Sequence, residues 1–344
     1  MDVHQLLAFA ADNGATELLC SAGVPPAMRK SGSLVRTRMD PLTPEIIDDM
    51  VRQVLGPERA ADLDNRSQLD FVYAWRPGVT WRISLFTDRG HRGAAFRLLS
   101  TEIPSPEKLL LPPVVRRVVE SGRGLILLGA APGHGRSTSL LSLADVVNHQ
   151  REAHILTLER RLKVLLAPDK SVIFQREIGA QDLPAALAAA VDQDPDLLMV
   201  THLAPTMLHD VLQLAARGRL VLCGCDAGST LQVIHHVLSG HAGEALTHLR
   251  AELGVSLRLV LAQQLLPGAD SKGSFLAGEV LSIGPDQARL LRTGDFASLA
   301  ALLQKPGIED VLSMDRCIQL LVRRELVSRA VARRYMNDEK LLES

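Results

Sequence analysis

The residues between Leu125 and Leu141 combine glycines, a cation and hydroxyl groups at a spacing that could hold a phosphate group. An apolar run precedes them and a helical pattern follows, so the helix dipole would favour an anion at this turn. In the pattern G-x-x-x-x-G-K-[ST], backbone amides surround the β-phosphate, a lysine contacts the β- and γ-phosphates, and a hydroxyl binds Mg²⁺. This stretch is therefore a candidate ATP site, with Ser137 on the Mg²⁺ of the nucleotide. Its residues are Gly133, His134, Gly135, Arg136, Ser137 and Thr138.

Two residues of this loop depart from the pattern. Ala130 stands in place of the first glycine, and Arg136 stands in place of the lysine. Arginine keeps the charge, but its side chain is longer and planar and cannot act as the compact point charge of a lysine. From the loop alone, a nucleotide site and a strand–turn–helix that binds nothing are both open interpretations.

The elements that must position this loop fall into two predicted domains. A helical opening and alternating, strand-like runs with a turn at Pro77 and Gly78 predict a small α+β domain over residues 1–100. A proline-rich segment predicts a linker over residues 101–113. From residue 114 to 344, short apolar runs alternate with helical stretches, which predicts an α/β domain with a doubly covered parallel sheet and a helical tail.

Composition argues against several partners. With 38 basic and 39 acidic residues, the 344-residue chain has a formal net charge of -1 and no bulk attraction to nucleic acid. Its four cysteines are too scattered for a disulfide framework or a paired zinc motif, so we expect a reducing, cytoplasmic compartment. No leader pattern opens the chain, and its apolar runs are shorter than the roughly 20 residues that span a bilayer. We predict no nucleic-acid partner and no transmembrane segment.

Short motifs spread along the whole sequence resemble those of one family. They are LCSAGVPPAMRKSG, WRISLFTDRGHRGAAFRLL, ILTLE, QREIG, DPDLLMV and LAQQLLP. In order and spacing the chain resembles the type IV pilus retraction ATPases, the twitching-motility motors of the type II/IV secretion ATPase superfamily. The resemblance implies a PAS-like N-terminal domain and a RecA-like P-loop ATPase domain. It also implies that ATP and Mg²⁺ bind at the domain boundary and between subunits.

The same resemblance implies partners and further site residues. Motors of this family are ring hexamers, so we expect a homo-hexamer or a mixed ring with an active pilus motor, beside an inner-membrane platform protein. The expected location is cytoplasmic, peripheral to the inner membrane at the pilus base. Arginines at the positions of Arg82, Arg89 and Arg97 contact nucleotide in related motors, and we expect the same here. The alternative for these arginines is a solvated basic strand face.

The acidic box of the family is largely basic in this chain. Its pattern T-[IL]-E-D-P-x-E appears as TLERRLK, which keeps Thr157 and Glu159. The Asp, the Pro and the second Glu have become Arg160, Arg161 and Lys163. Because hydrolysis needs groups that position water and hold Mg²⁺, Glu159 is left as the candidate base of this box.

Two further boxes have lost their catalytic residue. The Walker B segment D-P-D-x-[IL]-x-x-G-E appears as DPDLLMVTH, so His202 stands in place of the glutamate. The histidine box G-T-L-H-T-x-[ST] appears as CGCDAGS, so Asp226 stands in place of the histidine. An imidazole lacks a fixed negative charge for Mg²⁺, and a carboxylate repels the γ-phosphate. The candidate catalytic positions are therefore Glu159, His202 and Asp226, the last two degenerate.

Three functions are compatible with these changes. The first, which we favour, is a nucleotide-binding homologue of the retraction ATPases with little or no hydrolysis, acting as a structural or regulatory ring subunit. The second is an active retraction motor that uses Arg136 on the phosphates, Glu159 as base and Ser137 on Mg²⁺. The third is an interaction module that binds no ATP and offers a basic patch to another acidic partner or a nucleotide-like ligand. The residues of this patch are Arg136, Arg160, Arg161 and Lys163. The sequence leaves open whether the chain is an enzyme.

Other clusters have simpler explanations. His235, His236 and His241 are close in sequence, but adjacent histidines on a helix point apart, which favours surface or packing roles over metal binding. Cys223 and Cys225 lie on an apolar run, which favours a buried strand over a redox or zinc site. The basic, amphipathic run over residues 323–334 is typical of a solvated helix face.

Overall fold

The computed structural model describes residues 1–30, 33–64, 68–76, 78–88, 90–179, 181–269, 273–305, 307–308 and 310–342, without the side chains of residues 57–64. Two predicted features, the turn residue Pro77 and the nucleotide-binding Arg89, lie outside these residues. The chain divides into two compact units, Met1–Thr101 and Glu102–Ser344. Each unit has its own hydrophobic core.

The first unit packs helices against one face of an antiparallel sheet. Its helices are α1 (Val3–Asp12) and α2 (Pro44–Asp64). Gly56 kinks α2 with a φ of 74°, in the left-handed region that glycine enters without a steric penalty. The strands have the spatial order β3-β2-β1-β6-β5-β4. They are β1 (Glu17–Ser21), β2 (Ala27–Lys30), β3 (Ser33–Arg36), β4 (Gln68–Arg76), β5 (Val79–Asp88) and β6 (His91–Leu98).

Alternation along the strands decides which side chains reach the core of this unit. Trp81, Ile83 and Leu85 of β5 are fully buried and pack in one cluster with Leu7 and Met50 of the helices. Successive side chains of a strand point to opposite faces, so the residues between these three face away from the helices. Arg82 of β5, and Arg97 opposite it on β6, therefore lie on the other face of the sheet.

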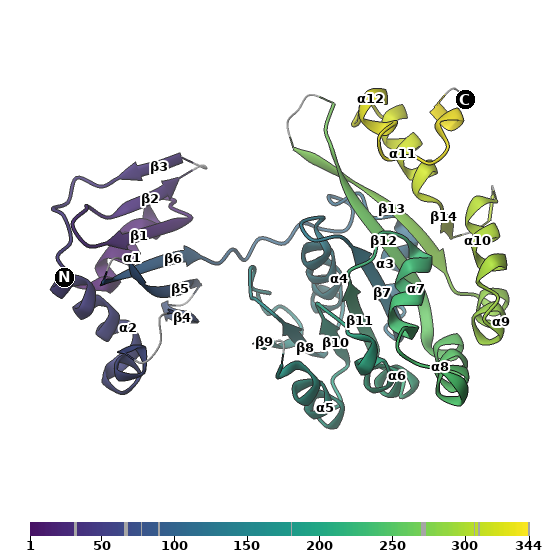
Figure 1. Cartoon of the computed structure of the whole chain (residues 1–344), viewed down its shortest axis with the longest axis horizontal. Coiled ribbons are helices and arrows are strands. Elements are labelled where there is room, and N and C mark those ends of the chain that lie inside the picture. Colours follow the sequence, from purple (N-terminus) through teal and green to yellow (C-terminus); the bar gives the residue numbers. More distant parts are fainter. Residues whose placement is uncertain are drawn as a thin grey trace. The chain divides into compact units, whose positions relative to one another are not determined.

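The second unit is a mixed sheet between two layers of helices (Figure 1). Its strands have the spatial order β14-β13-β12-β7-β11-β10-β8-β9. They are β7 (Gly124–Ala130), β8 (His154–Glu159), β9 (Val172–Glu177), β10 (Leu197–Val200), β11 (Leu220–Cys225), β12 (Leu257–Pro267), β13 (Ser274–Ser282) and β14 (Val311–Leu312). Neighbours from β12 to β9 are parallel, which confirms the predicted parallel sheet at its centre. At one edge, β13 and β14 add antiparallel pairs that the sequence analysis did not predict.

Helices cover both faces of this sheet because its central strands are apolar on both sides. Every residue of β7, β10 and β11 is buried. One face carries α3 (Pro113–Glu120) and α4 (Arg136–Gln150). The other face carries α5 (Leu183–Gln193), α6 (Leu208–Ala216), α7 (Thr230–Leu238), α8 (Gly243–Ser256), α9 (Pro285–Thr293) and α10 (Phe296–Gln304), with a 3₁₀ turn, η1 (Pro205–Met207), before α6.

The C-terminal segment differs from the single basic helix expected over residues 323–334. Helix α11 (Met314–Arg323) ends at the first residue of this run. Glu325 then takes a φ of 58°, and the side chain of Val327 is buried. The short helices α12 (Arg329–Ala332) and η2 (Glu339–Leu342) follow. The helix breaks because the left-handed residue lets the Leu326 N–H donate to Leu321 O at 3.0 Å. No helix in the described part of the chain is long and apolar enough to cross a membrane.

Candidate nucleotide-binding site

The predicted phosphate loop connects the end of β7, in the middle of the sheet, to the start of α4. Gly133 and Gly135 have φ values of 85° and 79°, which explains why glycine occupies both positions. Ser137 and Thr138 lie half-buried in the first turn of α4. Among the described residues, no side chain caps this helix start, so the N–H groups of the first turn can bind an anion.

The loop is fixed to the neighbouring strand β12 through His134. The Nδ1 of its imidazole accepts a hydrogen bond from Leu265 N at 2.9 Å, and Gln263 Nε2 donates to its carbonyl oxygen at 2.7 Å. His134 therefore connects the loop to β12, and contact of this residue with a nucleotide stays a prediction. The role of Gln263 was missed, although two glutamines in an otherwise apolar run were a signal of a polar contact inside the sheet.

A largely apolar pocket of about 330 Å³ lies beside the first turn of α4. It includes Gly135, Thr138 and Ser139, and the buried Ser139 Oγ has no hydrogen-bond partner among the described residues. The rest of its lining was not predicted from the sequence. These residues are Lys108, Leu109, Leu110, Leu265, Ser274, Phe275, Leu276 and Leu326. A nucleotide base needs an apolar cavity of this kind next to the phosphate loop.

Arg136 and Asp226 form an ion pair next to the loop. The Nη1 of Arg136 donates to Asp226 Oδ1 and, at 3.3 Å, to the Ala130 carbonyl oxygen. Burial alone would raise the pKa of Asp226, but the hydrogen bond and charge of Arg136 outweigh it and hold that pKa below its ordinary value. The pair brings together two of the predicted site residues, which follow adjacent parallel strands, β7 and β11.

His202 completes this cluster from the loop after β10. Its Nδ1 lies 3.6 Å from Asp226 Oδ2. Burial, and then the charge of Arg160, lower the pKa of His202 below the ordinary value of a histidine. The imidazole is therefore neutral at neutral pH and supplies no negative charge for a metal ion.

Glu159 lies in a different cluster and is 2% exposed. Its Oε1 accepts hydrogen bonds from Thr157 Oγ1 at 2.9 Å and from Gln175 Nε2 at 3.1 Å. Burial raises the pKa of Glu159, and these two hydrogen bonds offset only part of that effect. By contrast, Arg160, Arg161 and Lys163 of the same box are exposed.

The two aspartates that match the start of the Walker B segment lie at the amino-terminal ends of the parallel strands, whereas the loop lies at their carboxyl-terminal ends. Asp196 precedes β10, and its side chain accepts from Arg219 Nη1 at 2.7 Å and from His154 N at 2.9 Å. Asp194 pairs with the same guanidinium. These aspartates therefore join the starts of three neighbouring strands.

Arg82 and Arg97 of the first unit belong to a row of charges across its sheet. Register places Arg82 opposite Arg97, Arg97 opposite Glu17, and Glu17 opposite Arg29. Glu17 accepts from Arg29 Nε at 2.6 Å and Arg97 Nε at 2.8 Å. These hydrogen bonds, with Arg29 first, lower the pKa of Glu17. Arg82 is buried in the row, and nucleotide contact by Arg82 and Arg97 stays a prediction.

The remaining histidines and cysteines have structural surroundings. The ring of His235 packs against Phe296 with centroids 4.7 Å apart, and the Nε2 atoms of His236 and His241 lie 3.4 Å and 3.2 Å from backbone carbonyl oxygens. Cys223 and Cys225 are buried in β11, as predicted, and burial raises the pKa of Cys225 to about 12.

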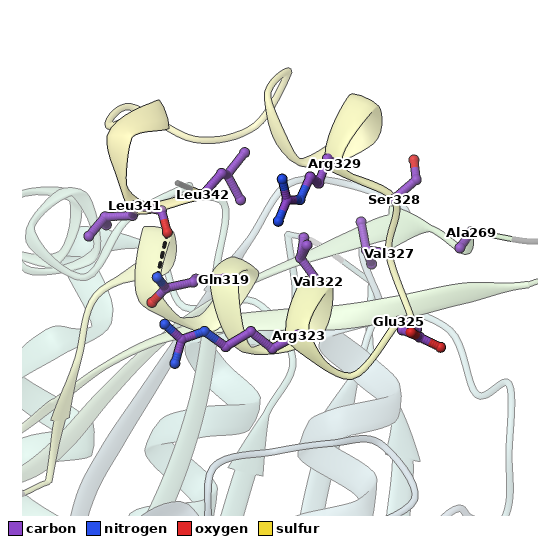
Figure 2. Close-up of a pocket in the computed structure, with 10 residues that line it drawn as sticks. All are labelled: Ala269, Gln319, Val322, Arg323, Glu325, Val327, Ser328, Arg329, Leu341 and Leu342. Atoms are coloured by element: carbon purple, nitrogen blue, oxygen red, sulfur yellow. Dashed lines mark hydrogen bonds between the residues drawn. The ribbon is translucent and has the colours of Figure 1, made fainter. Parts of the chain in front are cut away.

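A second hollow, of about 550 Å³, lies among the C-terminal helices (Figure 2). Arg323 and Arg329 line it, and Gln319 Nε2 donates to the Leu341 carbonyl oxygen at its edge. None of the predicted site residues lines this hollow. The loop after β7 therefore remains the candidate site.

Comparison with known proteins agrees with this fold. The family model described as type II/IV secretion system protein matches residues 110–342. The type IV pilus retraction ATPase PilT of Pseudomonas aeruginosa is 29% identical over 337 residues, covering 97% of both chains. The type IV pilus ATPase PilU of the same organism is 28% identical, covering 93% of this chain and 85% of its own. The crystal structure of the pilus retraction motor PilT with bound ADP has a TM-score of 0.84 at 28% identity, covering 100% of this chain and 99% of its own.

The chain belongs to the type II/IV secretion system protein family, and its likeness to the pilus retraction ATPases extends over its whole length. This likeness confirms the predicted fold class, a small PAS-like N-terminal domain followed by a RecA-like P-loop domain.

Proposed function

We propose that this chain is a nucleotide-binding member of the pilus retraction ATPase family that hydrolyses ATP little or not at all. The observation that carries the proposal is the Arg136–Asp226–His202 cluster: the cation of the loop is bonded to an acid, and a neutral imidazole stands in the Walker B position. Phosphoryl transfer depends on a positioned water and on groups that hold Mg²⁺ and the γ-phosphate. This cluster lacks the usual charges for both tasks.

Three observations support nucleotide binding. The loop keeps its left-handed glycines, the start of α4 has no side-chain cap among the described residues, and an apolar pocket adjoins it. The related PilT structure contains ADP. In this chain the amides of the first turn of α4 would hold phosphate, and Ser137 would hold the Mg²⁺ that neutralises phosphate charge.

The burial of Glu159 argues against the alternative hypothesis that the chain is an active motor with Glu159 as its base. In that alternative Glu159 must accept a proton from water, but its carboxylate is buried and bonded to Thr157 and Gln175. Loss of one transition-state contact commonly slows an enzyme by about 10² to 10³. Several such losses together would leave hydrolysis near the uncatalysed rate.

The role that fits a non-hydrolysing homologue is structural or regulatory. We propose that the chain forms a hexameric ring, alone or mixed with an active pilus motor, at the cytoplasmic face of the inner membrane next to a platform protein. The support is its likeness to PilT and PilU along nearly the whole chain.

Titration with fluorescent ATP and Mg²⁺, combined with a phosphate-release assay, tests the proposal. Saturable binding without steady release is the expected result. Absence of binding up to millimolar ATP would favour the interaction module, and release that Glu159→Gln abolishes would establish an active motor.

A pair of alanine variants, one inside the loop and one outside it, identifies the site. Ser137→Ala should weaken the Mg²⁺-dependent part of binding, because it removes the proposed hydroxyl ligand. Arg161→Ala, which removes an exposed cation from the loop after β8, should leave binding unchanged.

Light scattering of the full chain with and without nucleotide tests whether this chain forms a ring without another motor protein.

A further inference from the structure

The Arg136–Asp226 pair has a consequence for the ligand of the loop. A phosphate oxygen and a carboxylate oxygen are equivalent partners for a guanidinium, since both accept charge-assisted hydrogen bonds from it. We propose that Asp226 is an internal ligand of the phosphate loop, whose carboxylate occupies Arg136 and must give it up before a nucleotide phosphate can contact this cation. The inference rests on the proposed nucleotide binding.

The neighbouring strand makes room for the pair. Gly224 lies in β11, two residues before Asp226, and a Cβ added there would be 2.9 Å from Arg136 Cδ and 2.7 Å from the Thr201 carbonyl oxygen. The stem of Arg136 therefore crosses over the backbone of Gly224 on its way to Asp226. A larger residue at position 224 would exclude this path.

The segment that carries Asp226 is also held in place. A Cβ on Gly129 of β7 would be 2.8 Å from the Ala227 carbonyl oxygen, so this segment packs directly on the strand that leads into the loop. At its other end, Glu279 Oε1 accepts hydrogen bonds of 2.7 Å from both Thr230 N and Thr230 Oγ1. Packing and hydrogen bonds thus fix the backbone that presents the carboxylate.

The side chains themselves remain exchangeable. Asp226 is 44% exposed and Arg136 is 18% exposed, so the carboxylate can rotate into solvent. The recorded hydrogen bonds of Arg136 use Nη1, while its buried Nε has no partner among the described residues. The pair therefore lacks the two-pronged geometry that makes arginine–carboxylate contacts strongest, and a phosphate can compete with it.

The size of the effect follows from the fraction of molecules in which the pair is closed. If about 90% of unliganded molecules hold the closed pair, the apparent affinity for a ligand that needs free Arg136 falls about tenfold. Asp226→Asn should remove this competition and also the direct repulsion between the carboxylate and phosphate. If competition for Arg136 is the cause, the resulting gain in nucleotide affinity should appear only when Arg136 is present.

The test is a titration of the full chain with Mg²⁺ and ADP labelled on the ribose, with thermal unfolding as the check on folding. Four proteins are compared with the native chain: Asp226→Asn, Arg136→Ala, the double variant, and Asp192→Asn, which removes an exposed carboxylate on α5. We expect Asp226→Asn to lower the Kd about tenfold and Asp192→Asn to leave it unchanged. In the Arg136→Ala background the gain from Asp226→Asn should shrink to less than about threefold.

Each other outcome decides between the inference and the function on which it rests. If the native chain binds and Asp226→Asn binds equally or more weakly, the inference is overturned and the proposed function stands. A tenfold gain that persists with Arg136→Ala also overturns it, because repulsion alone then explains the gain. Binding by Asp226→Asn but not by the native chain supports the inference and overturns nucleotide binding by the native protein; binding by neither overturns both.

Discussion

The Nδ1 of His202 lies 3.6 Å from the Oδ2 of Asp226, while the other oxygen of the same carboxylate accepts a hydrogen bond from Arg136. One side chain therefore connects the loops that follow β7, β10 and β11. In the family pattern these three positions hold lysine, glutamate and histidine. Asp226 thus joins the other two replacements, one on each of its carboxylate oxygens.

Acidification should destabilise the protein through His202, because the lowered pKa means that the folded state binds fewer protons here than the unfolded chain. The free energy of unfolding then falls as the pH drops through about 6.5 towards the lowered folded value. Urea unfolding between about pH 5 and about pH 8 should show a smaller dependence on pH for His202→Gln than for the native chain. The charged and titratable groups around His202 are Arg136, Arg160, Asp226 and His236.

His149 provides a control of opposite sign. Its hydrogen bond with the Asp145 carbonyl oxygen, which is the largest cause, raises its pKa. The stabilisation from His149 is therefore complete below about pH 6.5 and is lost as the pH rises through the raised folded value. His149→Gln should steepen the loss of stability in acid, and an unchanged pH profile for His202→Gln would contradict the assignment to His202.

Glu159→Gln should stabilise the protein near neutral pH. Both recorded hydrogen bonds of Glu159 go to Oε1, which a glutamine can replace with its own carbonyl oxygen. Burial raises the pKa of Glu159, so its charged form is penalised above the folded pKa, and the penalty vanishes below the unfolded value of about 4.3. The thermal midpoint of the variant should exceed the native one at about pH 7 and match it near pH 4. A lower thermal midpoint for Glu159→Gln at neutral pH would show that the negative charge of Glu159 stabilises the folded protein.

Gly224→Ala should destabilise the second unit by about 1–3 kcal/mol, the usual effect of an overpacked site. The added Cβ meets the Thr201 carbonyl oxygen, the stem of Arg136 and, at 3.0 Å, Leu140 Cδ1. Adding Arg136→Ala relieves only the second contact, so urea unfolding of the double variant should recover part of the loss. Gly228→Ala is the matched control, because its Cβ meets only the side-chain oxygen of Gln232, at 3.3 Å. Equal effects of the two alanines would argue against the tight path over Gly224.

The position of the phosphate loop could be predicted from sequence because its signals are local. A buried strand, two glycines and a helix start follow one another between Gly124 and Gln150, and each is required by short-range geometry. The central parallel strands were predictable for the same reason, since a run buried on both faces is apolar throughout. The edge strands β13 and β14 were harder, because β13 pairs antiparallel with β12, and the two-residue β14 pairs with β13 only after α9 and α10 intervene in the chain.

The partners within the site could not be predicted, since they come from different parts of the chain. Arg136 and Asp226 are 90 residues apart, and they meet only because β7 and β11 are neighbours. Glu159 accepts a hydrogen bond from Gln175, which belongs to the next strand of the sheet, and it does not join the Arg136–Asp226–His202 cluster. A motif match states a residue type and a spacing, but the neighbours in the sheet decide what the side chain contacts.

Arg136→Lys should not produce hydrolysis, although it restores the residue that the loop pattern requires. A lysine is a compact point charge and cannot reproduce the planar guanidinium contact, so the pair with Asp226 should weaken and labelled ADP should bind more tightly. Steady phosphate release should nevertheless stay at background, because His202 is neutral and Asp226 still presents a negative charge to the γ-phosphate. Turnover should require His202→Glu and Asp226→His in the same chain as Arg136→Lys. Release by the single variant would show that the loop cation alone limits the reaction, and that the His202 and Asp226 replacements are compatible with catalysis.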